Sequence, residues 1–81
     1  MPNKLRVLSG DDVISFFERL GFKLVYSKSS HCKMVRMMPN GKQVIVLPRH
    51  KTIVKGTLKS IFNKALLYID EVILRKFFYT E

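Results

Sequence analysis

One histidine stands among small hydroxyls and lysines in the stretch Ser27-Lys28-Ser29-Ser30-His31-Cys32-Lys33. An imidazole changes its charge near neutral pH, so it can take a proton from a reacting group or supply one. Taken alone, a histidine at the start of a strand is more often an exposed polar side chain than a catalytic group. The local sequence therefore leaves two interpretations of His31 open, a reaction centre and a surface residue.

The chain as a whole is strongly basic. Its 81 residues include 15 lysines and arginines against 6 aspartates and glutamates, a formal net charge of +9. Such an excess attracts polyanions, and nucleic acid is the first partner to consider. A membrane surface is the other candidate, but the basic residues run from Lys4 to Lys76 and do not follow one face of an amphipathic helix. We therefore expect a nucleic-acid partner and no membrane.

Cleavage of a nucleic-acid phosphate would require fixed cations, because negative charge develops on the phosphate during the reaction. The candidates lie near His31 and again after Pro48; they are Lys28, Lys33, Arg36, Arg49, Lys51 and Lys55. Lys51, Lys55 and Lys59 also recur at four-residue spacing, which would align them on one face of a helix that began early. This row either contacts nucleic acid or is a solvated approach to the helix.

The second histidine, His50, lies in a stretch that is rich in donors and has no clear apolar period, Arg49-His50-Lys51-Thr52-Ile53-Val54-Lys55-Gly56. We interpret this stretch as a basic loop. The His50 imidazole could bind a phosphate, act as a second acid or cap the following helix, and the sequence slightly favours the structural role.

The cysteine and the methionines are expected to have structural rather than chemical roles. Cys32 is the only cysteine, so no intrachain disulfide can form, and the histidines and carboxylates show no metal-ligand spacing. We expect no metal and no cofactor. On a strand, Cys32 and His31 point to opposite faces, which favours a small core residue over a thiol nucleophile. Met34, Met37 and Met38 are expected to fill gaps rather than hold a soft ligand.

Size and targeting signals limit the possibilities further. A chain of 81 residues fits one domain, 1–81, and its core is too thin for a buried cofactor. The N-terminus lacks the apolar run of a signal peptide, and no stretch approaches the roughly 20 apolar residues of a membrane span. We expect a soluble, cytoplasmic protein.

Hydrophobic periodicity predicts three consecutive strands, with one helix before them and another after them in the chain. Ser9-Gly10-Asp11-Asp12 supplies a cap and first-turn acids for a helix over residues 10–20, which Gly21 ends. Period-two alternation predicts strands at 22–28, 31–37 and 44–47, with a turn at 39–42 and Pro48 after the last strand.

A second helix is predicted to begin near Gly56 or Thr57, and Asp70 is expected to cap a short third helix within 69–79. Apolar residues of this C-terminal extension either pack on the domain or serve a partner. Short connections favour an antiparallel meander of the three strands. Both main helices are then expected to bury their apolar sides against the same face of the sheet. The predicted fold is a two-layer α+β sandwich, α-β-β-β-α with a short C-terminal helix.

Two segments resemble the HicA toxins of bacterial and archaeal toxin-antitoxin pairs over about residues 8–66. Ser29-Ser30-His31 matches a Gly-Ser-His type motif, with Ser29 where glycine is usual. The more specific match is Pro48-Arg49-His50-Lys51 followed by Lys55-Gly56-Thr57-Leu58-Lys59-Ser60-Ile61. Glycine before His31 would permit dihedrals that serine reaches only with strain.

The resemblance implies a fold like that of double-stranded RNA-binding domains and a metal-independent endoribonuclease that cleaves mRNA. It places the catalytic histidine at His31 and implies a HicB-type antitoxin as protein partner. The residues expected to contact RNA are Lys28, Ser30, Lys33, Arg36, Arg49, His50, Lys51, Lys55 and Lys59.

Two other functions remain possible from the sequence. A non-catalytic module could recognise duplex RNA by its shape and phosphates. A basic DNA-condensing protein would show no preference for molecules with a 2′-hydroxyl. Only the toxin hypothesis predicts strand scission that depends on His31.

Overall fold

The structure is a computed structural model that describes residues 3–81, so residues 1 and 2 of the predicted domain 1–81 lie outside the described residues. Its elements in chain order are β1 (Lys4–Leu5), α1 (Gly10–Arg19), β2 (Lys23–Lys28), β3 (His31–Met38), β4 (Gly41–Pro48), α2 (Lys55–Ala65), α3 (Glu71–Phe78) and β5 (Tyr79–Thr80). This order confirms the predicted α-β-β-β-α arrangement with a short C-terminal helix.

β2, β3 and β4 form an antiparallel sheet with β3 in the middle. Both connections are tight hairpins, in which Lys28 pairs with His31 and Met38 pairs with Gly41. Cys32 and Met34 are buried on the face that meets the helices, as the alternation predicts. His31 therefore lies on the opposite, outer face of the sheet.

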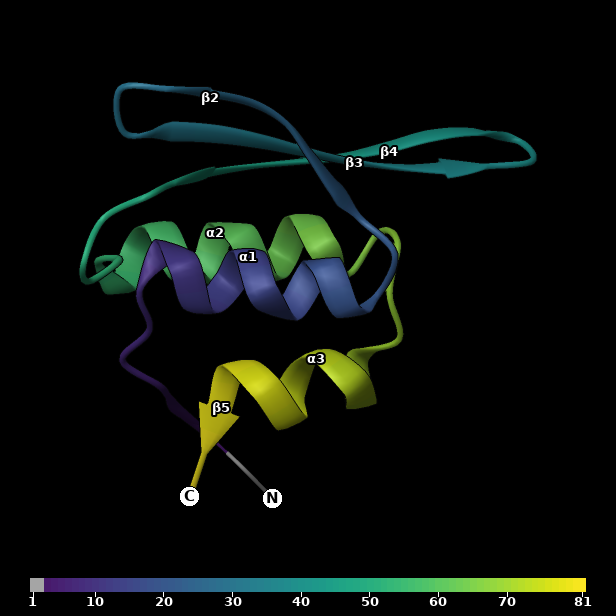
Figure 1. The fold of residues 1–81 in the computed structure, drawn as a ribbon. Helices are drawn as coiled ribbons and strands as arrows, with labels where there is room; N and C mark the ends of the chain where they lie inside the picture. Colours follow the sequence, from purple (N-terminus) through teal and green to yellow (C-terminus); the bar gives the residue numbers. More distant parts are fainter. Residues whose placement is uncertain (1–2) are drawn as a thin grey trace.

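Helices α1 and α2 both lie on the same side of this sheet, against its inner face (Figure 1). The core between the two layers is built from Val13 and Phe17 of α1, Leu58 and Phe62 of α2, and Met34, Ile45 and Leu47 of the sheet. This packing confirms the expectation that both main helices cover the same sheet face.

The beginnings of the two helices differ in their caps. At α1, the Ser9 side chain accepts from the Asp12 amide and the Asp12 carboxylate accepts from the Ser9 amide, both at 3.0 Å. These bonds hold the pKa of Asp12 below its ordinary value. Helix α2 begins at Lys55, one residue earlier than the earliest predicted start, and its N-cap Val54 has no side chain that can cap it.

Helix α3 forms a further layer on the side of α1 and α2 away from the sheet (Figure 1). Asp70 caps it as predicted, by accepting from the Val72 amide at 2.8 Å. The ring of Phe78 is fully buried and makes edge contacts with Phe16 and Phe62, at centroid distances of 5.8 and 5.5 Å. One side of the C-terminal extension therefore packs on the domain, which is the first of the two alternatives given by the sequence, while Val72 and Ile73 of α3 are exposed.

The sequence did not indicate the two short outer strands. β1 pairs with β5 in antiparallel fashion, with Lys4 opposite Thr80 and Leu5 opposite Tyr79. A two-residue strand is too short to show an alternating pattern. Within residues 3–81, no helix has the length and apolar character needed to cross a bilayer.

Candidate active site

His31 is the first residue of the central strand, at the end of the sheet where the β2–β3 hairpin turns. In register across the three strands, it lies between Lys28 of β2 and Pro48 of β4. Its side chain is exposed on the outer face. The following row on this face places Lys33 between Tyr26 and Val46. The strand pairing thus sets a histidine beside lysines on one exposed surface.

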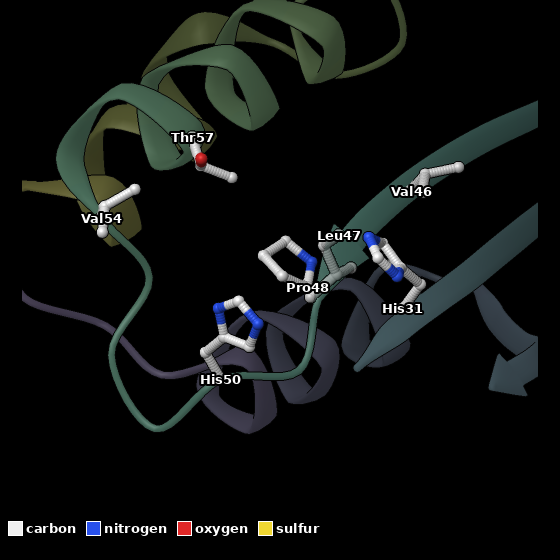
Figure 2. A pocket seen from close by; sticks show the side chains of 7 residues that line it. All are labelled: His31, Val46, Leu47, Pro48, His50, Val54 and Thr57. Atoms are coloured by element: carbon white, nitrogen blue, oxygen red, sulfur yellow. The ribbon is translucent and has the colours of Figure 1, made fainter. Parts of the chain in front are cut away.

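A pocket of about 400 Å³ opens beside His31, between the end of the sheet and the beginning of α2. His50 lines the same pocket, and the two imidazole rings lie on either side of the Pro48 ring (Figure 2). The remaining lining residues are Val46, Leu47, Pro48, Val54 and Thr57. The structure therefore brings together two histidines that are 19 positions apart in the sequence.

Backbone hydrogen bonds fix the loop that carries His50. The His50 carbonyl accepts from the Gly10 amide at 2.8 Å, and the Ser30 carbonyl accepts from the Arg49 amide. A little further on, the Ile53 amide donates to the Leu8 carbonyl at 2.9 Å. The basic loop is thus tied both to the start of α1 and to the hairpin that precedes His31.

Gly10 permits this close approach because it has no side chain. A Cβ atom at residue 10 would lie 2.5 Å from the Arg49 Cα and 2.6 Å from the Pro48 carbonyl oxygen. Both neighbours are backbone atoms, which cannot rotate away as a flexible side chain could. The packing of α1 against the loop therefore requires glycine at this position.

Ser29 adopts the backbone conformation that its glycine-like position in the motif predicts. It is the first residue of the two-residue β2–β3 loop and has φ of 55°, the only positive φ outside glycine among residues 3–81. The left-handed region costs an L-residue roughly 1–2 kcal/mol. The turn before His31 thus contains the strain that the sequence comparison with Gly-Ser-His predicts.

Several of the predicted site residues lie near the two histidines. Lys28 is directly opposite His31, Lys33 is on the same face one row away, and Ser30 immediately precedes His31. Lys55 is in the first turn of α2, between the pocket-lining residues Val54 and Thr57. The uncapped N-terminus of α2 adds the positive end of a helix dipole at the pocket edge.

Arg36 is not part of this group, because its side chain lies on the inner face of the sheet, opposite to the face that carries His31. Its guanidinium donates to the Gln43 side chain at 2.8 Å and to the carbonyls of Leu20 and Tyr68 at 2.8 and 3.3 Å. It also lies 4.8 Å from the centre of the Phe22 ring. These contacts assign Arg36 to the structural framework, and its predicted contact with RNA has no support from its position.

Arg49 and the row of lysines occupy other positions. The Arg49 guanidinium pairs with Asp11 at 2.7 Å, and this bond raises its pKa above the ordinary value. Lys55 and Lys59 are exposed one turn apart on α2, whereas Lys51 precedes the helix in the loop. The alignment on one helix face depended on an early helix start, and because α2 begins at Lys55 it does not include Lys51.

Sequence reasoning missed the apolar wall of the pocket and the role of Gly10. Val46 was identified only as part of the strand 44–47 and Val54 only as part of the basic loop, and neither assignment indicated a pocket. Pro48 and Thr57 were identified as the end of a strand, as a possible helix start and as members of the matching segment, but not as residues that line a pocket. Within residues 3–81, no group of three histidine, cysteine or acidic residues is arranged to hold a metal ion.

Comparison with known proteins identifies the same family that the sequence motifs resemble. The family model described as the HicA toxin of bacterial toxin-antitoxin systems matches residues 10–67, which include His31, His50 and the whole sheet. No curated protein and no solved structure matches the chain.

Replacing Gly10 by alanine is expected to lower the free energy of unfolding by about 1–3 kcal/mol, because the new methyl group overlaps the Arg49 and Pro48 backbone. Urea denaturation measures the change. Gly56→Ala is the matched control, since a Cβ there meets no atom within 4 Å and helix propensity favours alanine. Equal stability of the two variants would contradict the close approach at Gly10.

Ser29→Gly is expected to raise the free energy of unfolding by about 1 kcal/mol, because glycine adopts the positive φ of this turn without strain. Ser30→Gly, one residue later, has no positive φ to relieve and is expected to lower it by a few tenths of a kcal/mol or more. The thermal midpoints of both variants test this difference. A stabilised Ser30→Gly with an unchanged Ser29→Gly would show that the strain is not at Ser29.

Proposed function

Because the chain belongs to the HicA toxin family of bacterial toxin-antitoxin systems, we propose that it is an endoribonuclease toxin that cleaves mRNA with His31 as a proton-transferring residue. The observation that carries this proposal is the position of His31 at the edge of an open pocket, on the exposed basic face of the sheet. Exposure by itself also fits a surface residue, so the pocket and the adjacent Lys28 are what favour the catalytic interpretation.

The chemistry proposed for His31 is that of a general base. Cleavage of RNA without a metal requires a group that takes the proton from the ribose 2′-hydroxyl, which then attacks the neighbouring phosphorus. Within residues 3–81, the His31 ring makes no hydrogen bond to the protein, so its nitrogens are free to meet the substrate. A well-placed histidine contributes about 10²- to 10⁴-fold in rate.

Electrostatics support an anionic substrate at this site. Lys28 faces His31 across the strand pair, Lys33 lies on the same face, and the N-terminus of α2 borders the pocket. Fixed positive groups of this kind hold a phosphate and stabilise the charge that develops on it. We therefore propose Lys28 and Lys33 as the principal phosphate contacts, with Lys55 and Lys59 binding more distant parts of the RNA.

A HicB-type antitoxin is the proposed protein partner. The family is defined by toxin-antitoxin systems, and an inhibitor would have to prevent RNA from reaching His31. The pocket and the outer sheet face are both open to solvent, so a protein laid over them would be sufficient. We propose this face as the surface that the antitoxin covers.

The proposed role of His31 can be tested by measuring the rates at which wild type and His31→Ala cleave the same RNA transcripts in the presence of EDTA. We expect wild type to cut and the variant to lose about 10²- to 10⁴-fold in rate, because only the proton transfer is removed. RNA affinity, measured in parallel, should change little. Met37→Ala is the control, because Met37 is an exposed residue at the other end of the same strand.

Binding by both proteins without cutting by either would identify a non-catalytic RNA-binding module. Equal binding of RNA and DNA without cutting would favour the DNA-condensing alternative. Retention of full activity by His31→Ala would show that His31 is a surface residue.

Lys28→Met is expected to weaken RNA binding and to reduce the slope of log K against log salt by about 0.7, the value for one phosphate contact on a single strand. Lys42→Met removes the same charge from the same sheet face at its far end, opposite Met37, and should leave the slope unchanged. Titrations at several salt concentrations measure both. Identical slopes for the two variants would mean that net charge, rather than position beside His31, determines binding.

A further inference from the structure

We infer that His50 is the general acid of the reaction and protonates the 5′-oxygen that leaves as His31 takes the 2′-hydroxyl proton. The inference rests on the proposed function and adds a second catalytic residue to it. Its basis is that both imidazoles line one pocket, on either side of Pro48 (Figure 2).

The reaction needs two proton transfers. The 2′-oxygen gives its proton to His31 and forms a bond to phosphorus, while the bond between phosphorus and the 5′-oxygen breaks and that oxygen receives a proton from His50. The products are a 2′,3′-cyclic phosphate and a 5′-hydroxyl, and no oxidant, reductant or further reactant takes part. Proton exchange with water returns both imidazoles to their starting states.

His50 is the pocket residue whose chemistry fits the second role. Of the other lining residues, His31 is already assigned and four have aliphatic side chains, while the Thr57 hydroxyl does not exchange protons readily near neutral pH. Lysine is a poor proton donor to a leaving group at this pH because its ordinary pKa is about 10.4. Asp11, the carboxylate close to this loop, is paired with Arg49.

The position of His50 is fixed by its backbone while its ring remains free. Its carbonyl accepts from the Gly10 amide, and the adjacent Arg49 is tied through its amide to Ser30 and through its side chain to Asp11. Within residues 3–81, the His50 ring has no hydrogen-bond partner. A rigid support with an unoccupied imidazole is what a general acid requires.

The structure also removes one of the other roles considered for His50. The N-cap of α2 is Val54, four residues further along the chain, so His50 does not cap this helix. Phosphate binding remains as the competing role. Loss of a residue that only binds phosphate would lower the cleavage rate equally for all leaving groups. Loss of a general acid would lower the rate most for a leaving group that must be protonated in order to leave.

The test compares an ordinary oligoribonucleotide with one that carries sulfur in place of the bridging 5′-oxygen at the bond that wild type cuts. A thiolate leaves without protonation, so it does not need the acid. We expect His50→Ala and His50→Gln to lose about 10²- to 10⁴-fold on the ordinary oligonucleotide and to recover to within about tenfold of wild type on the sulfur substrate. His31→Ala should remain about 10²- to 10⁴-fold below wild type on both substrates.

The dependence of single-turnover rate on pH provides a second readout. Wild type should show a bell-shaped profile from one base and one acid, and His50→Ala should lose the alkaline limb. The charged groups near the two rings are Lys28 and Lys33 on the sheet, the Arg49–Asp11 pair, Lys51 in the loop and Lys55 on α2. Since these groups remain in the variant, loss of the limb would report His50 itself.

Thr52→Ala, in the same exposed loop, controls for general disturbance of this segment and should cut like wild type. The inference is overturned if His50→Ala cuts both substrates within threefold of wild type, or if its loss is equal on the two substrates. In either case, loss of cutting by His31→Ala would leave the proposed function intact. Failure of wild type to cut would instead refute the proposed function.

Discussion

The contact between Gly10 and the backbone of Pro48 and Arg49 determines how the parts of the candidate site are held together. At this point the first turn of α1 meets the end of β4 with no side chain between them. The same few residues bond to the His50 carbonyl and, through Arg49, to the hairpin before His31. The relative positions of the two histidines therefore depend on a residue that has no functional group of its own.

Much of the fold could be predicted because its determinants are local. Ser9 and Asp70 are side-chain caps whose partners lie two or three residues away, so the helix starts are visible in the sequence. Alternation along β3 likewise separates Cys32 from His31. These features depend only on neighbouring residues and on the geometry of helices and strands.

The candidate site was less predictable because it is formed by contacts between distant segments. His31 was identified from its motif, but no local pattern indicates that His50 shares its pocket or that Gly10 supports the loop between them. Charge alone also did not show which basic side chains are available to bind RNA. Arg36 and Arg49 belong to the same basic excess as Lys28, yet their guanidinium groups are engaged with Gln43, backbone carbonyls and Asp11.

The pairing of β1 with β5 has a consequence for the order in which the chain folds. Lys4 and Thr80 come together from opposite ends of the described chain, so this contact closes the longest loop among the strand pairings of residues 3–81. Loop-closure entropy grows with length, and local contacts form more readily than distant ones. The sheet and its hairpins, which carry His31, are therefore expected to assemble before the two terminal strands meet, and the terminal pair acts as a late closure rather than as a nucleus.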